Sequence, residues 1–531
     1  MNWKCRAALC LAIAGLALVG TLPADATNMV WNLGAGTVDN WTNPTRWNPN
    51  GVPGPGDQAT VYNTDDGNLN SIVLDSDQTV GGVLFPNHNH WCVISNTAAR
   101  LTVVTNLIYQ PRSFSASTGP WSYVYPMATI QGKVLVEDLT VSPYFNSALV
   151  FANTGNVFQS GFDISGNRIH ITNWYNTFSG PIKVRGWQGE WWSTDERSSG
   201  AVHIHGSNNT FYAGSFELLP GGQIWISQSS DLAALSGVTF NGGTLQLGRP
   251  GQNYSNNFAV VSFPNGWEVK AGTLHVSGNP CLGPAAIGVK LGSPGYYGCL
   301  KGEANNAAGA RIERPITLTG NGGVLDSFYP NVSYPSTLNR TWDFYISGLI
   351  SGAGDLIVRG HNQSGTYINN GTYAGYTPNT YVGDTRVLAA SGLIVENLRS
   401  LGTGNLVIDV AGYVLNYTTN IVTPGKTITI KGGGTGRLRP KGYLRIATTG
   451  DMAYPISADS DGALLLSMNT TGMTTFNNWI ANNQLGNGYM WLGGDGTLAA
   501  TALPAGAGGV YRLWGCPWNG SWLGGSVLGS T

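Results

Sequence analysis

The chain has few charged residues. Lys, Arg, Asp and Glu make up 10% of its 531 residues, against roughly 25% in an ordinary soluble domain. The 27 basic and 28 acidic side chains nearly cancel, so that the net charge is -1. This balance excludes both the basic footprint of a nucleic-acid-binding protein and an acidic solvating tail. We therefore expect no nucleic-acid partner.

Cysteine is also scarce, with six residues in the whole chain. Four lie beyond the N-terminal segment: Cys92, Cys281, Cys299 and Cys516. No Cys-x-x-Cys motif or His spacing typical of zinc accompanies them, so we expect no metal site and no cofactor. Cys281 and Cys299 flank a stretch rich in Gly and Pro, and they are the candidate pair for a disulfide if the chain enters an oxidising compartment.

Long apolar runs are absent apart from one near the N-terminus. Lys4 and Arg6 precede an uncharged apolar run at 7–20, and Ala24-Asp25-Ala26 then resembles a cleavage signal. These features predict a secretory signal peptide at 1–26, with Thr27 as the first mature residue. No later stretch reaches the roughly 18 apolar residues of a membrane span. We expect an exported protein, extracellular or at the cell surface, with no membrane span after signal removal.

Amphipathic helical periodicity is missing too, although the chain has enough apolar surface to fold. Hydrophobic residues make up 42% and aromatic residues 11% of the sequence, and 75 glycines punctuate it. Short apolar or alternating runs recur between Gly and Asn residues, which is typical of strands. We therefore predict an all-β fold. The strands are expected at 71–74, 79–85, 101–104, 133–136, 243–247, 272–276, 355–358, 405–410 and 426–430.

Two motifs repeat along the chain, which favours a solenoid. One is Asn-x-aromatic followed by Gly, and it occurs at Asn156, Asn176, Asn209 and Asn379. Asn and Gly tolerate left-handed turns, and we expect the aromatic residue to fill the interior of a coil. The other is a Gly-rich turn followed by a short strand, and it occurs at 242–245, 271–274, 322–325 and 411–415.

The segment 352–415 combines several short motifs. It contains a Gly-Ala-Gly turn and strand at 352–358, Asn-Thr-Tyr-x-Gly at 379–383, Thr-x-Val at 385–387 and Leu-Gly-x-Gly at 401–404. In this order the motifs resemble the autotransporter-associated β-strand repeat. The insertion 361–378 departs from the family's pattern. The resemblance implies a right-handed parallel β-helix with coils of roughly 20–25 residues. We expect an N-terminal cap region at 27–85, dense in Trp and Pro, and a β-helix repeat region at 86–531. No matching C-terminal cap is evident.

The one dense group of charged and aromatic residues lies at 185–205. Trp faces stack on sugar rings and carboxylates accept hydroxyl hydrogens, so this segment is the candidate binding site for a surface polysaccharide or other glycan. The candidate glycan-binding residues are Trp187, Glu190, Trp191, Trp192, Asp195, Glu196 and Arg197, and His203 and His205 follow them. No catalytic residues are identified.

The N-terminal region is loosely acidic but contains no calcium-binding loop motif. Its acidic residues are Asp57, Asp65, Asp66, Asp75 and Asp77.

The sequence favours an exported structural or adhesive surface solenoid of the passenger type. The alternative is a glycan-binding protein or a pectate-lyase-like, carbohydrate-active β-helix enzyme, and parallel β-helices also house such enzymes. That alternative requires several carboxylates to converge on one face of the solenoid.

Overall fold

The fold is described from a computed structural model of the chain. Strands account for 51% and helices for 5% of the described residues, which confirms the all-β prediction. The structure describes residues 26–31, 38–61, 70–88, 92–111, 121–137, 148–166, 168–186, 201–212, 214–227, 230–248, 266–276, 278–283, 286–302, 310–327, 344–360, 365–368, 379–389, 391–395, 401–416, 426–432, 442–446, 455–467, 471–494 and 497–514.

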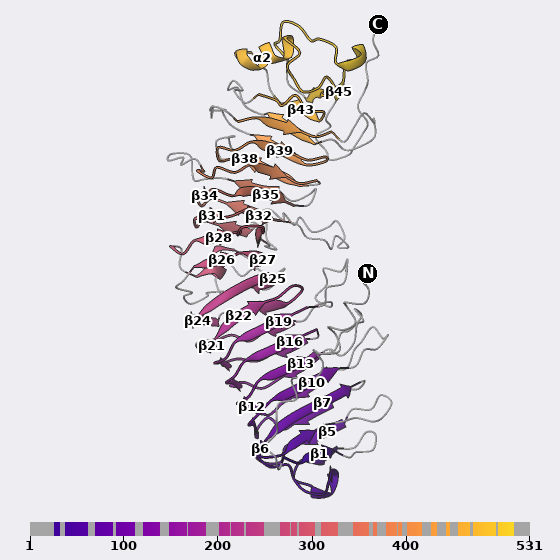
Figure 1. The fold of residues 1–531 in the computed structure, drawn as a ribbon, viewed down its shortest axis with the longest axis vertical. Helices are drawn as coiled ribbons and strands as arrows, with labels where there is room; N and C mark the ends of the chain where they lie inside the picture. The colour runs from indigo at the N-terminus through magenta and orange to yellow at the C-terminus, as the bar shows by residue number, and fades with distance from the viewer. Residues whose placement is uncertain are drawn as a thin grey trace, which may run out of the picture.

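The chain winds into an elongated parallel β-helix in which each strand pairs with the strand one coil further along (Figure 1). Among the named strands of the described ranges, the pairings are parallel except for that of β1 (Asn28–Trp31) with β3 (Trp47–Asn48). The asparagines of the Asn-x-aromatic motif show the coil length. Asn156 and Asn176, 20 residues apart, and Asn176 and Asn209, 33 residues apart, occupy equivalent places in successive coils. The expected solenoid is therefore present, with coils that vary in length because insertions differ between them.

The N-terminal half has three sheets. Sheet A contains β1 (Asn28–Trp31), β4 (Gln58–Thr60), β7 (Gly82–His88), β10 (Leu107–Pro111), β13 (Val134–Glu137), β16 (Phe162–Ser165), β19 (Ile182–Arg185), β22 (Ser215–Leu218) and the start of β25 (Gly237–Leu247). Sheet C contains β6 (Gln78–Val80), β9 (Arg100–Val103), β12 (Met127–Ile130), β15 (Val157–Phe158), β18 (Thr177–Phe178), β21 (Asn209–Tyr212) and β24 (Ser230–Ala234).

Sheet B extends through both halves and joins them. It contains β2 (Val38–Asn40), β5 (Asn70–Val73), β8 (Cys92–Ser95), β11 (Trp121–Val124), β14 (Ala148–Phe151), β17 (Arg168–Ile171), β20 (Ala201–Ile204), β23 (Gln223–Ile226), the end of β25, β27 (Ala271–Val276), β29 (Gly298–Gly302), β32 (Gly322–Asp326), β35 (Asp355–Arg359), β37 (Thr385–Val387), β39 (Leu406–Ile408) and β41 (Ile428–Ile430).

In the C-terminal half two further sheets accompany sheet B. Sheet D contains β26 (Trp267–Val269), β28 (Val289–Leu291), β31 (Ile316–Leu318) and β34 (Ile350–Gly352). Sheet E contains β30 (Ala310–Ile312), β33 (Phe344–Ile346), β36 (Gly365–Ile368), β38 (Gly392–Val395), β40 (Tyr413–Asn416), β42 (Tyr443–Ile446), β43 (Ala463–Leu466), β44 (Trp491–Gly494) and β45 (Leu513–Trp514). The short 3-10 helices are η1 (Pro44–Arg46), η2 (Asn279–Leu282) and η4 (Ala507–Gly509).

Ladders of identical side chains run through part of the interior. Asn156, Asn176 and Asn209 are completely buried, and each amide bonds to the next: Asn156 Nδ2 donates to Asn176 Oδ1 at 2.8 Å, and Asn176 Nδ2 donates to Asn209 Oδ1 at 2.9 Å. The aromatic residue two positions later stacks in the same way in three successive coils. The ring centroids of Phe158, Phe178 and Phe211 are separated by 5.2 Å and 4.7 Å. The Asn-x-aromatic motif therefore fills the coil interior as predicted.

The glycine that follows this motif is required by close backbone contact. A Cβ atom at Gly180 would lie 2.2 Å from the carbonyl carbon of Ser160 and 2.3 Å from the nitrogen of Gly161. Any side chain there would separate two successive coils, because rigid backbone lies at the contact.

The predicted run 79–85 is not one strand. The chain turns at Gly81, so that Gln78–Val80 joins sheet C as β6 and Gly82–His88 joins sheet A as β7. Both parts bury apolar side chains, and a corner between two buried strands leaves no polar gap in the sequence that would reveal it. The other eight predicted strands each overlap an observed strand.

The two ends of the described rod differ. At the N-terminal end Trp31, Trp41 and Trp47 are at most 2% exposed and pack edge to face at 4.7 Å and 4.9 Å. At the other end α2 (Thr474–Ala481) lies beyond β43 (Figure 1). This helix was not among the elements predicted from the sequence, although buried Phe476 and Ile480 have helical spacing and face the core.

Candidate functional site

Strands β17 and β20 bring two histidines side by side on the outer face of sheet B. Ile169, Ile171, Val202 and Ile204 belong to the solenoid core, and side chains alternate along a strand. His170 and His203 therefore point away from the core, and the strand register pairs them directly. His205 follows β20 by one residue and has the same orientation as His203, since it is two positions further along.

The three imidazoles form one compact cluster. Each offers a ring nitrogen that lies within 4.8 Å of those of the other two. His170 Nδ1 and His205 Nε2 are 3.0 Å apart, and these two rings stack at 5.2 Å with an interplanar angle of 8°. The ring of His203 stands edge-on to that of His170, with centroids 4.7 Å apart.

The cluster is buried although it lies on the outside of the sheet. His203 is 1% exposed and His170 is 8% exposed, whereas His205 is half-buried. Trp225, in the next coil, closes one side: its ring lies 4.9 Å from that of His203 and 5.4 Å from that of His205. Its Nε1 donates to the carbonyl oxygen of Gly248 at 2.6 Å, which fixes the ring.

Burial favours the neutral form of His170 and His203. It lowers the pKa of His170 to about 3, with smaller contributions from the charges of His205 and Arg168. Burial is also the main reason that the pKa of His203 lies well below its usual value. Arg168, only 5% exposed, is the cation that acts on both rings. Neutral imidazoles retain a lone pair, which is the form that binds metal ions.

His203 carries the most unusual environment in the cluster. Within the described part of the chain, neither Nδ1 nor Nε2 of this buried ring has a hydrogen-bond partner. A neutral imidazole presents one donor and one acceptor, and an unsatisfied buried polar atom costs about 1–3 kcal/mol. The arrangement can therefore accept a ligand at His203 without breaking an existing hydrogen bond of that ring.

The sequence identified only part of this cluster. His203 and His205 belong to the candidate segment 185–205, whereas His170 was not singled out and no metal site was expected. The seven proposed glycan-binding residues, Trp187, Glu190, Trp191, Trp192, Asp195, Glu196 and Arg197, lie outside the described residues. The alternating apolar residues around His170 and His203 place both histidines on one face, but only the coil length aligns them.

The described carboxylates in the acidic N-terminal region are used in local hydrogen bonds. Asp57 accepts from the nitrogen of Gly54 at 2.8 Å, Asp77 accepts from the nitrogen of Arg100 at 2.8 Å, and Asp75 accepts from the hydroxyl of Thr42. Asp65 and Asp66 lie outside the described residues. Within the described residues, three or more His, Cys, Asp or Glu side chains bring their donor atoms together in one group. That group is the cluster of three histidines.

Cys281 and Cys299 do not form the suggested disulfide; both are buried thiols. Cys281 follows β27 in η2 and packs in the solenoid core. Cys299 lies in β29, where Leu300 faces the core and Cys299 alternates to the opposite face of sheet B. The strand therefore separates the two sulfur atoms. Burial raises the pKa of the Cys299 thiol to about 12, which makes it a poor nucleophile.

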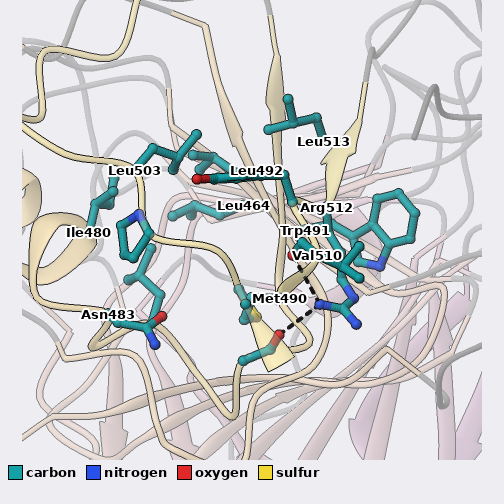
Figure 2. Close-up of a pocket in the computed structure, with 15 residues that line it drawn as sticks. Leu464, Ile480, Asn483, Met490, Trp491, Leu492, Leu503, Val510, Arg512 and Leu513 are labelled. Carbon is teal, nitrogen blue, oxygen red and sulfur yellow. Dashed lines mark hydrogen bonds between the residues drawn. The ribbon is translucent and has the colours of Figure 1, made fainter. Parts of the chain in front are cut away.

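A small pocket lies near the C-terminal end of the rod, between α2, β44 and β45 (Figure 2). Its volume is about 60 Å³, well below the roughly 300–1,000 Å³ of pockets that hold drug-sized ligands. Arg512 is the charged residue in its lining, and its Nη1 donates to the carbonyl oxygen of Gly488 at 2.9 Å. This pocket is thus suited to water rather than to an organic ligand.

Comparison with protein-family models, with curated proteins and with solved structures finds no match to this chain. In the described part of the chain, no helix has both the length and the apolar character needed to cross a membrane.

Proposed function

We propose that this chain is an exported structural solenoid that acts as an adhesive body at the cell surface or outside the cell. The observation that carries the proposal is the uninterrupted sheet B, whose strands are hydrogen-bonded from one coil to the next between β2 and β41. Together with the internal Asn and Phe ladders, this sheet gives an extended rigid rod. Such a rod presents its loops at fixed spacing, which suits multivalent attachment to a polymer.

Three further features support this proposal. The segment 352–415 resembles the autotransporter-associated β-strand repeat of surface passengers, and the N-terminal residues resemble a secretory signal. The candidate glycan-binding segment 185–205 begins at the end of β19 in sheet A and ends just after β20 in sheet B. A glycan that binds there would stack on Trp187, Trp191 or Trp192. The partner class we propose is therefore a surface polysaccharide.

Export can be tested on the protein secreted by cells that express the full chain. The expected intact mass is that of a chain beginning at Thr27, and fractionation should recover the protein outside the cytoplasm. A full-length chain that remains in the cytoplasm would contradict export.

Adhesion can be tested by retention on a set of insoluble polysaccharides. We expect the double variant Trp191→Ala/Trp192→Ala to lose retention while its secretion and β content remain unchanged. Trp174→Ala is the matched control, because Trp174 is 54% exposed in the turn after β17 and lies outside the candidate segment. If no polysaccharide retains the wild-type protein, the adhesive role is wrong. Release of soluble sugars during incubation would instead support the enzymatic alternative.

A further inference from the structure

We propose that His170, His203 and His205 form a binding site for a divalent transition-metal ion, of which Zn²⁺ is the representative. The site shares His203 and His205 with the end of the candidate segment 185–205 but includes none of the seven candidate glycan-binding residues, and it does not depend on the adhesive role. It would join two successive coils, since His170 comes from the coil of β17 and the other two ligands from the coil of β20.

The spacing of the donor atoms fits such an ion. Two nitrogens that bind one tetrahedral Zn²⁺ at about 2.0–2.1 Å lie roughly 3.3 Å apart. His170 Nδ1 and His205 Nε2 are 3.0 Å apart, and the cluster's donor atoms all lie within 4.8 Å of one another. The ring of His203 would have to turn for its nitrogen to reach bonding distance. Three protein ligands leave a fourth position for water or another ligand.

The chemistry of the donors selects the class of metal. The cluster offers three imidazoles, and imidazole suits Zn²⁺, Cu²⁺ and Ni²⁺, whereas Ca²⁺ and Mg²⁺ prefer oxygen ligands. Binding would also give the buried ring of His203 the partner that it lacks within the described ranges. Arg168 opposes this binding through its charge, so we expect the affinity to be moderate rather than extreme.

The main alternative is that the imidazoles serve only as packing. His170 and His203 continue a column on the outer face of sheet B that runs from Val150 to Trp225. Valine fills the equivalent position one coil earlier, so packing alone does not require histidine. The two interpretations predict different results. Only a metal site binds Zn²⁺, and only then does substitution of each of the three histidines weaken that binding.

The test uses the mature chain without a polyhistidine tag, stripped with EDTA and then titrated with Zn²⁺ by calorimetry. Co²⁺ is the spectroscopic probe, because tetrahedral nitrogen ligation gives intense visible d–d bands. We expect one ion per chain, and a loss of about 10–100-fold or more in affinity for each of His170→Val, His203→Ala and His205→Ala. Zn²⁺ should also raise the melting temperature of the wild-type protein but not of these variants.

His275→Ala is the matched control. His275 lies in the same outer column of sheet B and is 8% exposed, as His170 is, but it lies outside the cluster. We expect this variant to bind Zn²⁺ as the wild type does. His170→Val introduces the residue of the preceding coil, and half-buried His205 lies just beyond its strand, so these two variants keep the test informative if His203→Ala fails to fold. The proposal is overturned if the wild type binds neither Zn²⁺ nor Co²⁺, or if His170→Val and His205→Ala both retain wild-type affinity.

Discussion

The asparagine ladder should be a major source of stability, and Asn176 is the residue that tests it best. Asn176 Oδ1 accepts from the backbone nitrogen of Asn156 at 3.1 Å and from its Nδ2 at 2.8 Å. Asn176 Nδ2 donates to Asn209 Oδ1 at 2.9 Å and to the carbonyl oxygen of Asn173 at 2.6 Å. One side chain thus connects three successive coils.

The expected cost of Asn176→Ala follows from the groups that it leaves behind. The backbone N–H of Asn156 loses its acceptor at a fully buried position, and an unsatisfied buried group costs about 1–3 kcal/mol. Asn156 Nδ2 keeps its bond to the carbonyl oxygen of Asn153, and Asn209 Oδ1 keeps the bond from the nitrogen of Asn176. The two lost side-chain bonds, from Asn156 Nδ2 and to Asn209 Oδ1, add about 0.5–1.5 kcal/mol each. We expect a total loss of about 2–6 kcal/mol in the free energy of unfolding.

Urea unfolding followed by far-UV circular dichroism measures this loss. The control is Thr177→Ala, the next residue of the same motif, which is half-buried in β18 and should cost less than about 1 kcal/mol. Asn176→Asp should be at least as harmful as Asn176→Ala, because an oxygen would then face Asn209 Oδ1. If Asn176→Ala is no more destabilising than Thr177→Ala, the ladder does not stabilise the solenoid in the way argued.

Two other predictions concern the backbone contact between coils and a buried lysine. Gly180→Ala should destabilise the protein by about 1–3 kcal/mol or more, because its Cβ would meet the backbone of Ser160. In the control Gly237→Ala, the added Cβ meets nothing within 4 Å. Equal urea midpoints for the two variants would contradict the contact. Lys426 is 1% exposed and donates to the carbonyl oxygens of Leu401 and Gly402, and burial lowers its pKa from 10.5 to about 8. Between these two pH values the unfolded chain binds the proton more strongly than the folded chain, so stability should rise with pH by about 3 kcal/mol relative to Lys426→Met. A constant difference between wild type and Lys426→Met over that pH range would show that burial does not perturb this lysine.

Much of the fold was predictable from the sequence, because its determinants are local and repeated. The Asn-x-aromatic motif identified buried Asn156, Asn176 and Asn209 and the Phe residues that stack beside them. Glycine marked the corners where backbones touch. Successive coils repeat the same residue types at equivalent positions, so the pattern can be recognised without knowing which residues contact one another.

Other features depended on tertiary structure. The sequence separates His170 from His205 by 35 residues, and only the pairing of β17 with β20 across an insertion decides that the two rings meet. Tertiary structure likewise places Cys281 in the core and Cys299 on the opposite face of sheet B, and it divides the apolar run at 79–85 between two sheets. The local sequence determined which residues form strands and which side chains are buried in the core, because strand formation and burial depend on turn geometry and on side-chain alternation. The lengths of the coils decided which outward-facing residues meet, because alignment between coils depends on every insertion that lies between them.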